Sequence, residues 1–337
     1  MTTRRLSTVD AFVITDLDDA PLSVGIVRQA PKLLVEGAGW LARSQTYQFA
    51  SFERQVGGAS AGINAPAEAR AEAIAAFVAE FTPDSGTVLL DAGKGLGPGE
   101  IGALRAADPR PAAAVEEAAR LRRAGIVAAT ELALGGLDGR AIAIEGVDTA
   151  GPELAAALVA GGARIVAVST ASGTALSESG FDPTQLAEAL GAHRADCVKE
   201  LGVEARPGWA VHGAAADALL VGSKPGALDH NGAAHVKATA VVPTASLPVT
   251  AKALANLGRR GVAVLPDFIV TAGPLAAWPS SGDAPTSVSD AAAGALVTAA
   301  LSEVLGSPQG ALLAACERAE SFLRTWRSEL PFGRPIA

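Results

Sequence analysis

Apolar and polar positions in the first third of the chain predict a small sheet with helices. Short apolar runs are bounded by turns rich in Asp, Gly and Pro, and apolar residues recur at helical spacing from Asn64 to Phe81. A second helical pattern runs from Pro111 to about Leu134, where Gly135 and Gly136 end it. The expected strands are residues 11–15, 22–27 and 88–91.

The second half of the chain has the order of a doubly wound α/β fold. A strand at residues 141–145 leads through a glycine turn at 146–151 to a helix at 152–160 and a strand at 164–168, which together make one βαβ unit. Three further apolar strands predict a parallel sheet that is buried on both faces. They are residues 218–221, 240–242 and 262–265, and helical patterns follow at 288–305 and 310–326.

These patterns predict an α/β fold in three parts. We expect an N-terminal α/β domain over residues 1–125 and a Rossmann-like, doubly wound parallel-sheet domain over residues 126–285. Residues 286–337 are expected to form C-terminal helices that pack back on the first domain.

Composition narrows the class of protein. The 337 residues are 49% hydrophobic and 18% charged, which is typical of a folded chain and excludes disorder. The net charge is −8 and basic residues form no run longer than a pair, so we expect no nucleic-acid partner. Apolar stretches are interrupted before about 20 residues, so no membrane span is expected. Because the first residues carry no apolar signal-peptide segment, we expect a cytoplasmic protein with Cys197 and Cys316 as reduced thiols.

The glycine turn at 146–151 resembles a dinucleotide fingerprint with one position changed. Gly146 and Gly151 stand where the first and last glycines of G-x-G-x-x-G belong, but Asp148 replaces the middle one. A carboxylate there would repel a pyrophosphate, and the next strand ends in Ser169 and Thr170 instead of an acid for the ribose. The turn therefore fits either a βαβ unit kept for packing or a degenerate nicotinamide site, and NAD(P) is a doubtful cofactor.

Several segments, in order along roughly residues 20–300, resemble motifs of the glutamate/leucine/phenylalanine/valine dehydrogenases. Gly57-Gly-Ala-Ser-Ala-Gly-Ile63 looks like the family's G-G-x-K-G-G-x loop. The stretch that starts at Asp91-Ala-Gly-Lys94 looks like the segment that begins with the family's catalytic aspartate. Later segments look like the entry to the nucleotide fold and its following strands and loops, at residues 137–146, 217–221, 242–250 and 261–273.

The resemblance implies oxidative deamination of an α-amino acid with NAD(P). In such enzymes one lysine activates the attacking water, an aspartate moves protons to and from nitrogen, and another lysine holds the carboxylate. Read forward, Asp91 matches the aspartate, whereas counting back from Glu100 puts Gly93 there. The two lysine positions carry Gln48 and Ser60, so Lys94 is the nearby group that would supply a missing positive charge.

Two interpretations follow from these departures. The first is a non-catalytic, regulatory or scaffold homologue, because Gln48, Ser60 and Asp148 all replace functional groups. The alternative is an NAD(P)-dependent oxidoreductase acting on an amino acid or related CH–NH2 substrate, with Asp91 and Lys94 as relocated catalytic groups.

Partners and metals follow the same two interpretations. The resemblance implies a homo-oligomer, or a hetero-oligomer with an active homologue, and a small-molecule ligand is compatible with both. No metal site is expected, because His193 and Cys197 offer only two ligands where a metal site needs three or four.

Overall fold

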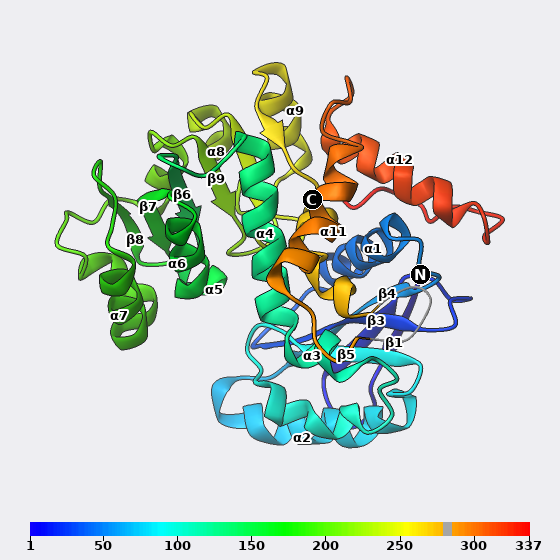
Figure 1. Cartoon of the computed structure of the whole chain (residues 1–337). Coiled ribbons are helices and arrows are strands. Elements are labelled where there is room, and N and C mark those ends of the chain that lie inside the picture. The colour runs from blue at the N-terminus through cyan, green and yellow to red at the C-terminus, as the bar shows by residue number, and fades with distance from the viewer. Residues whose placement is uncertain (279–284) are drawn as a thin grey trace. The chain divides into compact units, whose positions relative to one another are not determined.

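The computed structural model describes residues 1–278 and 285–337 of the chain and divides into two compact units (Figure 1). The first unit comprises residues 1–110 and 316–335, and the second comprises residues 111–315 with 336–337. The division falls at Arg110 and Pro111, whereas the expected domain change at residue 126 lies inside a helix, Ala118–Leu134. Residues 279–284, inside the expected second domain, lie outside the described part of the chain.

The first unit is built on a five-stranded sheet in the order β1-β2-β4-β3-β5. Strands β3, β4 and β5 are parallel, while β2 is antiparallel to both β1 and β4. The three strands expected from sequence are confirmed as β2, β3 and β5. The bounds are β1 Thr2–Arg5, β2 Ala11–Thr15, β3 Ser23–Ala30, β4 Gly57–Asn64 and β5 Val88–Ala92.

Strand β4 corrects the interpretation of Gly57–Ile63 as a loop. Gly58 is needed because α1 (Val35–Ser51) packs directly against the strand, so that a Cβ on Gly58 would lie 1.8 Å from the carbonyl oxygen of Ala42. The opposite face of the sheet carries α2 (Arg70–Phe81), whose Ile74 and Phe77 share an apolar cluster with Ala59 and Ala61. The α2 helix begins later than the sequence pattern predicts, after a 3-10 turn at Ala67–Ala69. Further 3-10 turns are Thr82–Asp84 and Pro98–Arg105.

The second unit holds the doubly wound sheet that the sequence predicts. Its strand order is β11-β10-β9-β6-β7-β8, and every neighbouring pair is parallel except β7 and β8. Strand β8, an antiparallel edge strand, was not expected from sequence. The bounds are β6 Ala141–Glu145, β7 Arg164–Thr170, β8 Gly173–Leu176, β9 Ala218–Val221, β10 Ala240–Pro243 and β11 Ala263–Val264.

Helices surround this sheet, and the expected helix from Pro111 to Leu134 is divided at Glu117 into α3 and α4. The helix expected at 152–160 is confirmed as α6. The helices are α3 Ala112–Glu116, α4 Ala118–Leu134, α5 Val147–Ala150, α6 Pro152–Ala160, α7 Pro183–His193, α8 His230–His235, α9 Ala251–Arg259, α10 Asp267–Val270 and α11 Asp290–Ser302. The 3-10 turns are Arg194–Lys199, Gly208–Gly213 and Gly273–Ala277.

The two helices expected near the C-terminus are both present. Helix α11 belongs to the second unit, whereas most of α12 (Ala311–Leu323), from Cys316 onward, belongs to the first unit.

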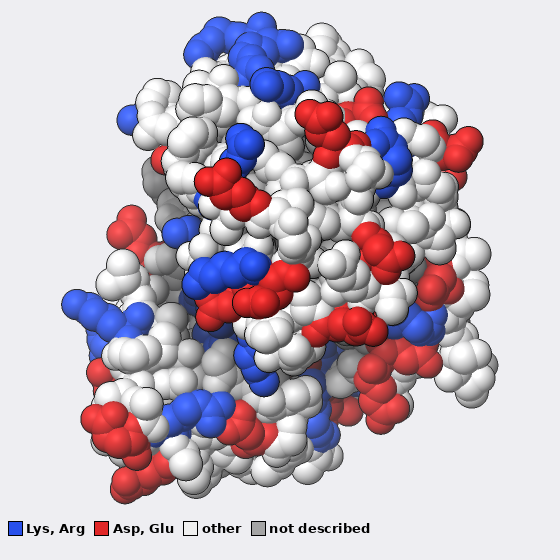
Figure 2. All heavy atoms as spheres, turned by 90° about the vertical axis from the view of Figure 1, so that its left-hand side faces the viewer, with Lys and Arg blue, Asp and Glu red and all other residues white. Residues whose placement is uncertain are grey.

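In the described part of the chain, no helix is both long and apolar enough to cross a membrane. Basic and acidic side chains are intermixed on the face that Figure 2 shows.

Candidate functional site

Asp91, the expected proton-transfer group, is held by two arginines at the end of β5. Its Oδ1 accepts hydrogen bonds from Nη2 of Arg105 at 2.6 Å and from Nη2 of Arg110 at 2.8 Å. Its Oδ2 accepts from Nη1 of Arg110 at 2.9 Å. Asp108 joins the same two arginines, at 3.0 Å from Arg105 and 2.7 Å from Arg110. We call these four residues the Asp91 cluster.

Burial and charge in the Asp91 cluster set the ionisation state of Asp91. The Arg110 and Asp108 side chains are 5% and 9% exposed, and that of Asp91 is 33% exposed. Burial raises the pKa of Asp91, but the hydrogen bonds and charges of Arg110 and Arg105 outweigh it and leave that pKa below its usual value. A general acid or base works best when its pKa lies near the working pH. Asp91 therefore remains ionised and bound at neutral pH.

Lys94, the second expected catalytic group, lies in the turn after β5. Its side chain is exposed, and its carbonyl oxygen accepts a hydrogen bond from the backbone N–H of Gln29 at 3.0 Å. This bond fixes the turn beside the end of β3. The recorded partners of Asp91 are the two arginines, so the structure does not join Asp91 and Lys94 into one group.

The two positions that the resemblance assigns to lysines lie on neighbouring elements. Gln48 is on α1 and is 8% exposed, and Ser60 is on β4 and fully buried. Ser60 is in register with Ile14 of β2 and Ile26 of β3. Its Oγ has no hydrogen-bond partner within the described ranges 1–278 and 285–337. Neither side chain provides an amine.

The expected cofactor turn in the second unit contains a break. Gly146 has φ +74° and Gly151 has φ +87°, and the four residues between them form the single helical turn α5. Asp148 is exposed within that turn. The longer helix α6 begins only after Gly151, so α5 and α6 are separated by this one residue, whose backbone lies outside the helical region.

Glu145, which the sequence analysis did not single out, bridges two strand ends. Its Oε2 accepts hydrogen bonds from the backbone N–H groups of Gly222 and Ser223, each at 3.0 Å, and its Oε1 accepts from the Ser223 hydroxyl. Strands β6 and β9 are neighbours at the point where the chain order reverses, which is the usual ligand crevice of such folds. The signal in the sequence that could have pointed to Glu145 is its position, a glutamate between an apolar strand and Gly146.

Ser169 and Thr170 end the next strand, and their polar groups are engaged locally. The carbonyl oxygen of Ser169 accepts from the N–H of Gly146 at 3.0 Å. The Thr170 hydroxyl donates to the carbonyl oxygen of Ala195 and accepts from the N–H of Ser172 at 3.1 Å. In the sequence, strand β7 ends in Ser169 and Thr170 where an acid for the ribose hydroxyl is expected.

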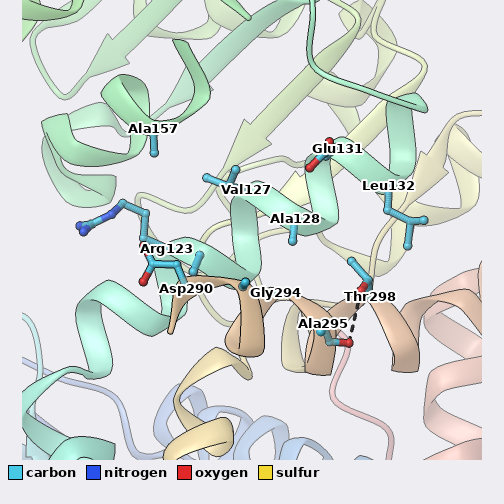
Figure 3. Close-up of a pocket in the computed structure, with 12 residues that line it drawn as sticks. Arg123, Val127, Ala128, Glu131, Leu132, Ala157, Asp290, Gly294, Ala295 and Thr298 are labelled. Carbon is cyan, nitrogen blue, oxygen red and sulfur yellow. Dashed lines mark hydrogen bonds between the residues drawn. The ribbon is translucent and has the colours of Figure 1, made fainter. Parts of the chain in front are cut away.

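A separate hollow of about 540 Å³ in the second unit is lined by helices α4, α6 and α11 (Figure 3). Val127, Ala128, Ala157, Gly294 and Ala295 give it a surface of mostly small side chains. Thr298 donates its hydroxyl to the carbonyl oxygen of Ala295, as Figure 3 shows.

Within residues 1–278 and 285–337, no group of three or more His, Cys, Asp or Glu side chains could hold a metal ion.

Comparison with known proteins agrees with this fold. The chain matches solved structures of hetero-hexameric glutamate dehydrogenase from Thermus thermophilus in a leucine-bound form (20% identity, 96% of this chain, 81% of that chain, TM-score 0.69) and of L-tryptophan dehydrogenase from Nostoc punctiforme (17%, 96%, 95%, 0.62). Glutamate dehydrogenase of Plasmodium falciparum also matches (13%, 95%, 80%, 0.73). At these identities the matches show the shared fold, and no curated protein matches the chain.

A comparison with family models concerns the sequence itself and not only the fold. Residues 123–278 match the model of the Glutamate/Leucine/Phenylalanine/Valine dehydrogenases. The matched residues contain the whole parallel sheet, from β6 to β11, together with the glycine turn. Residues 123–278 therefore carry the sequence pattern of the glutamate/leucine/phenylalanine/valine dehydrogenase family, and the chain as a whole is similar in fold to dehydrogenases of this kind.

Proposed function

We propose that this chain is a non-catalytic member of the amino-acid dehydrogenase family that acts as a regulatory or scaffold subunit. The observation that carries the proposal is the Asp91 cluster. Read forward, the resemblance puts a proton-transfer group at Asp91, yet Arg105 and Arg110 bind both of its oxygens. Counted back from Glu100, that position is Gly93, which has no side chain for proton transfer. A carboxylate whose pKa is held below its usual value is a weaker base, and both of its oxygens are already engaged by guanidinium groups, so it accepts a proton from a substrate less readily.

The lysine positions support the same proposal. Gln48 and Ser60 carry neither the charge that would hold a substrate carboxylate nor the amine that would activate water. Losing one general acid or base costs about 10²–10⁴ in rate. Two replaced lysines, together with an aspartate bound by arginines, would remove the ordinary chemistry.

The residues at the glycine turn do not fit a nicotinamide dinucleotide. Dehydrogenases of this family use NAD(P), whose pyrophosphate needs backbone N–H groups and a close approach of the backbone. Here Asp148 puts an exposed carboxylate inside the glycine turn, and directly before the turn Glu145 places a second carboxylate against the N–H groups of Gly222 and Ser223, in the loop after β9.

A subunit without its own chemistry acts through partners. The Thermus thermophilus relative is a hetero-hexameric glutamate dehydrogenase, which supports assembly of this chain with an active homologue or with copies of itself. The place of action would be the cytoplasm, and a small molecule is the ligand class that the fold favours.

The test is turnover by the purified chain with NAD⁺ or NADP⁺ and a panel of α-amino acids, measured as absorbance of the reduced nicotinamide. We expect none. The alternative, an NAD(P)-dependent oxidoreductase that acts on an amino acid or related CH–NH2 substrate, is favoured only by Lys94, an exposed cation three residues after Asp91. That enzyme would turn over, and Asp91→Asn and Lys94→Ala would abolish its turnover, while Lys252→Ala, an exposed lysine on α9, would not.

A further inference from the structure

A second cavity, of about 720 Å³, lies in the first unit. None of the residues that line it belongs to the Asp91 cluster. Its walls come from β1, β2, the start of α1 and the chain after α12, and all its lining residues belong to the first unit. The volume is in the range of small-molecule sites. The apolar wall is formed mainly by Ile14, Leu17, Val35, Trp40, Leu330 and Phe332.

A buried ion pair lines this cavity and fixes one of its walls. Nε of Arg43 lies 2.7 Å from Oδ2 of Asp16, and the two side chains are 4% and 0% exposed. Nη1 of Arg43 also donates to the carbonyl oxygens of Phe332 and Gly333. Arg43 therefore holds the C-terminal segment in place as a wall, and its charge and that of Asp16 compensate each other.

The remaining carboxylates of the lining are not all compensated. Asp19 pairs with Arg327, and Asp18 lies 3.6 Å from the Met1 amine. For Glu36 and Glu329, which are both exposed, no ion pair is found within residues 1–278 and 285–337. The cavity thus combines apolar walls with two available negative charges.

Exposed apolar side chains gather at the same cavity. Phe332 is 96% exposed and Met1 is 53% exposed, and both line it. Large apolar side chains held in water beside a cavity are typical of a binding site. Trp40 adds an aromatic ring, whose face attracts cations.

We propose that this cavity binds an organic cation, namely a primary amine carried on an aromatic or alkyl body. The apolar body lies against Trp40 and Phe332, and the ammonium group faces Glu36 and Glu329. An aliphatic amine is protonated at neutral pH, as lysine is. The site is independent of the proposed function, because it shares no residue with the Asp91 cluster or the glycine turn.

The test is calorimetric titration of the full chain with three probes of matched shape. These are 2-phenylethylamine, 2-phenylethanol and 3-phenylpropionate, which differ chiefly in charge. We expect the amine to bind at least about 10-fold more tightly than the alcohol, and the carboxylate to bind most weakly. Equal affinities for the three probes, or no binding of the amine, would overturn the proposal.

Variants of the two glutamates test whether their charges cause the preference for the amine. The double variant Glu36→Gln, Glu329→Gln should remove the preference for the amine over the alcohol, and both positions are exposed, so folding is retained. The matched control Glu188→Gln, exposed on α7, should leave it unchanged. A preference that survives the double variant contradicts the proposal. Sedimentation velocity tests whether a second copy of the chain fills the cavity instead. A dimer that dissociates on Phe332→Ser and excludes the amine would assign the cavity to that second copy and overturn the proposal.

Discussion

Arg110 binds Asp91 through both of its terminal nitrogens, at 2.9 Å and 2.8 Å, and binds Asp108 with the same guanidinium group. The arginine lies 19 residues after Asp91 in the sequence, and its side chain is 5% exposed. The interaction converts the residue that most resembles a catalytic aspartate into one member of a structural ion-pair network. A network of this kind needs all its members, because each buried charge depends on the others.

Replacing Arg110 with methionine tests this network as a source of stability. The variant leaves two carboxylates with only Arg105 between them, and breaking a buried ion pair costs about 3–5 kcal/mol. Since Asp91 is one third exposed and Arg105 remains, we expect a loss of about 2–4 kcal/mol in the free energy of unfolding by urea. Arg4→Gln, which breaks an exposed ion pair with Asp84, should cost less than about 1 kcal/mol. Similar losses in the two variants would contradict the buried network.

Gly146 is predicted to be required for its backbone conformation and for its neighbour. Its φ is +74°, and a Cβ there would lie 2.6 Å from the Cβ of Ser223. Gly139 has a similar φ of +69° but open space around the same position. Each Gly→Ala change costs about 1–2 kcal/mol in backbone strain, and the contact at Gly146 adds about 1–3 kcal/mol. Thermal unfolding of the two variants measures the difference, and equal destabilisation would show that β6 and the loop after β9 do not meet as described.

Protonation of His212 is expected to make the folded chain less stable below about pH 6.5. Burial lowers the pKa of His212 below 6.5, the charges of Glu145 and Asp229 raise it, and His235 lowers it further. The unfolded chain therefore binds more protons at this site than the folded chain, so the free energy of unfolding falls as the pH drops through 6.5. Urea unfolding of His212→Leu between pH 5 and 8 should show a smaller fall. His230→Gln, an exposed histidine, should behave as the unchanged chain does, and a fall of equal size in both variants would rule out His212 as its cause.

Glu80 predicts a second loss of stability in acid. Hydrogen bonds from the Thr8 hydroxyl and from the N–H groups of Ser7 and Thr8 lower the pKa of Glu80 from 4.5 to about 2. A lowered pKa in the folded state stabilises the fold above pH 4.5, and this contribution is lost between pH 4.5 and 2. Titration of the Glu80 carboxyl by carbon NMR should give the lowered pKa. Ser7→Ala with Thr8→Ala removes the two hydroxyl donors and keeps the N–H donors, so it should raise this pKa part of the way, whereas an unchanged value would show that the hydroxyl contacts are absent in solution.

The regular part of the fold follows from the sequence because its signals are local. Apolar runs and helical spacing identify β2, β3, β5 to β7 and β9 to β11, and glycines mark the C-terminal end of α4. The sequence predicts a loop in place of β4 because Gly57, Gly58 and Gly62 are typical of turns. Gly58 is explained by the close approach of α1 and Gly62 by the ring of Phe12 on β2, and both are contacts between distant parts of the chain.

The candidate site was predictable only in part, for the same reason. The resemblance identified Asp91, Gln48 and Ser60 as the positions to inspect. The role of Asp91 depends on Arg105 and Arg110, which approach it through a 3-10 turn that carries no periodic signal. Similarly, Glu145 reaches Gly222 and Ser223 across 77 and 78 residues, so no spacing in the sequence points to that contact.

Calorimetric titration with NAD⁺, NADH, NADP⁺ and NADPH tests the central claim most directly, because a dehydrogenase of this family requires one of them. The claim that Glu145 and Asp148 exclude the dinucleotide predicts no binding with a dissociation constant below about 100 μM, which corresponds to roughly 5–6 kcal/mol. Binding tighter than this, together with formation of reduced nicotinamide from an amino acid, would contradict the account and show that the chain is an active dehydrogenase.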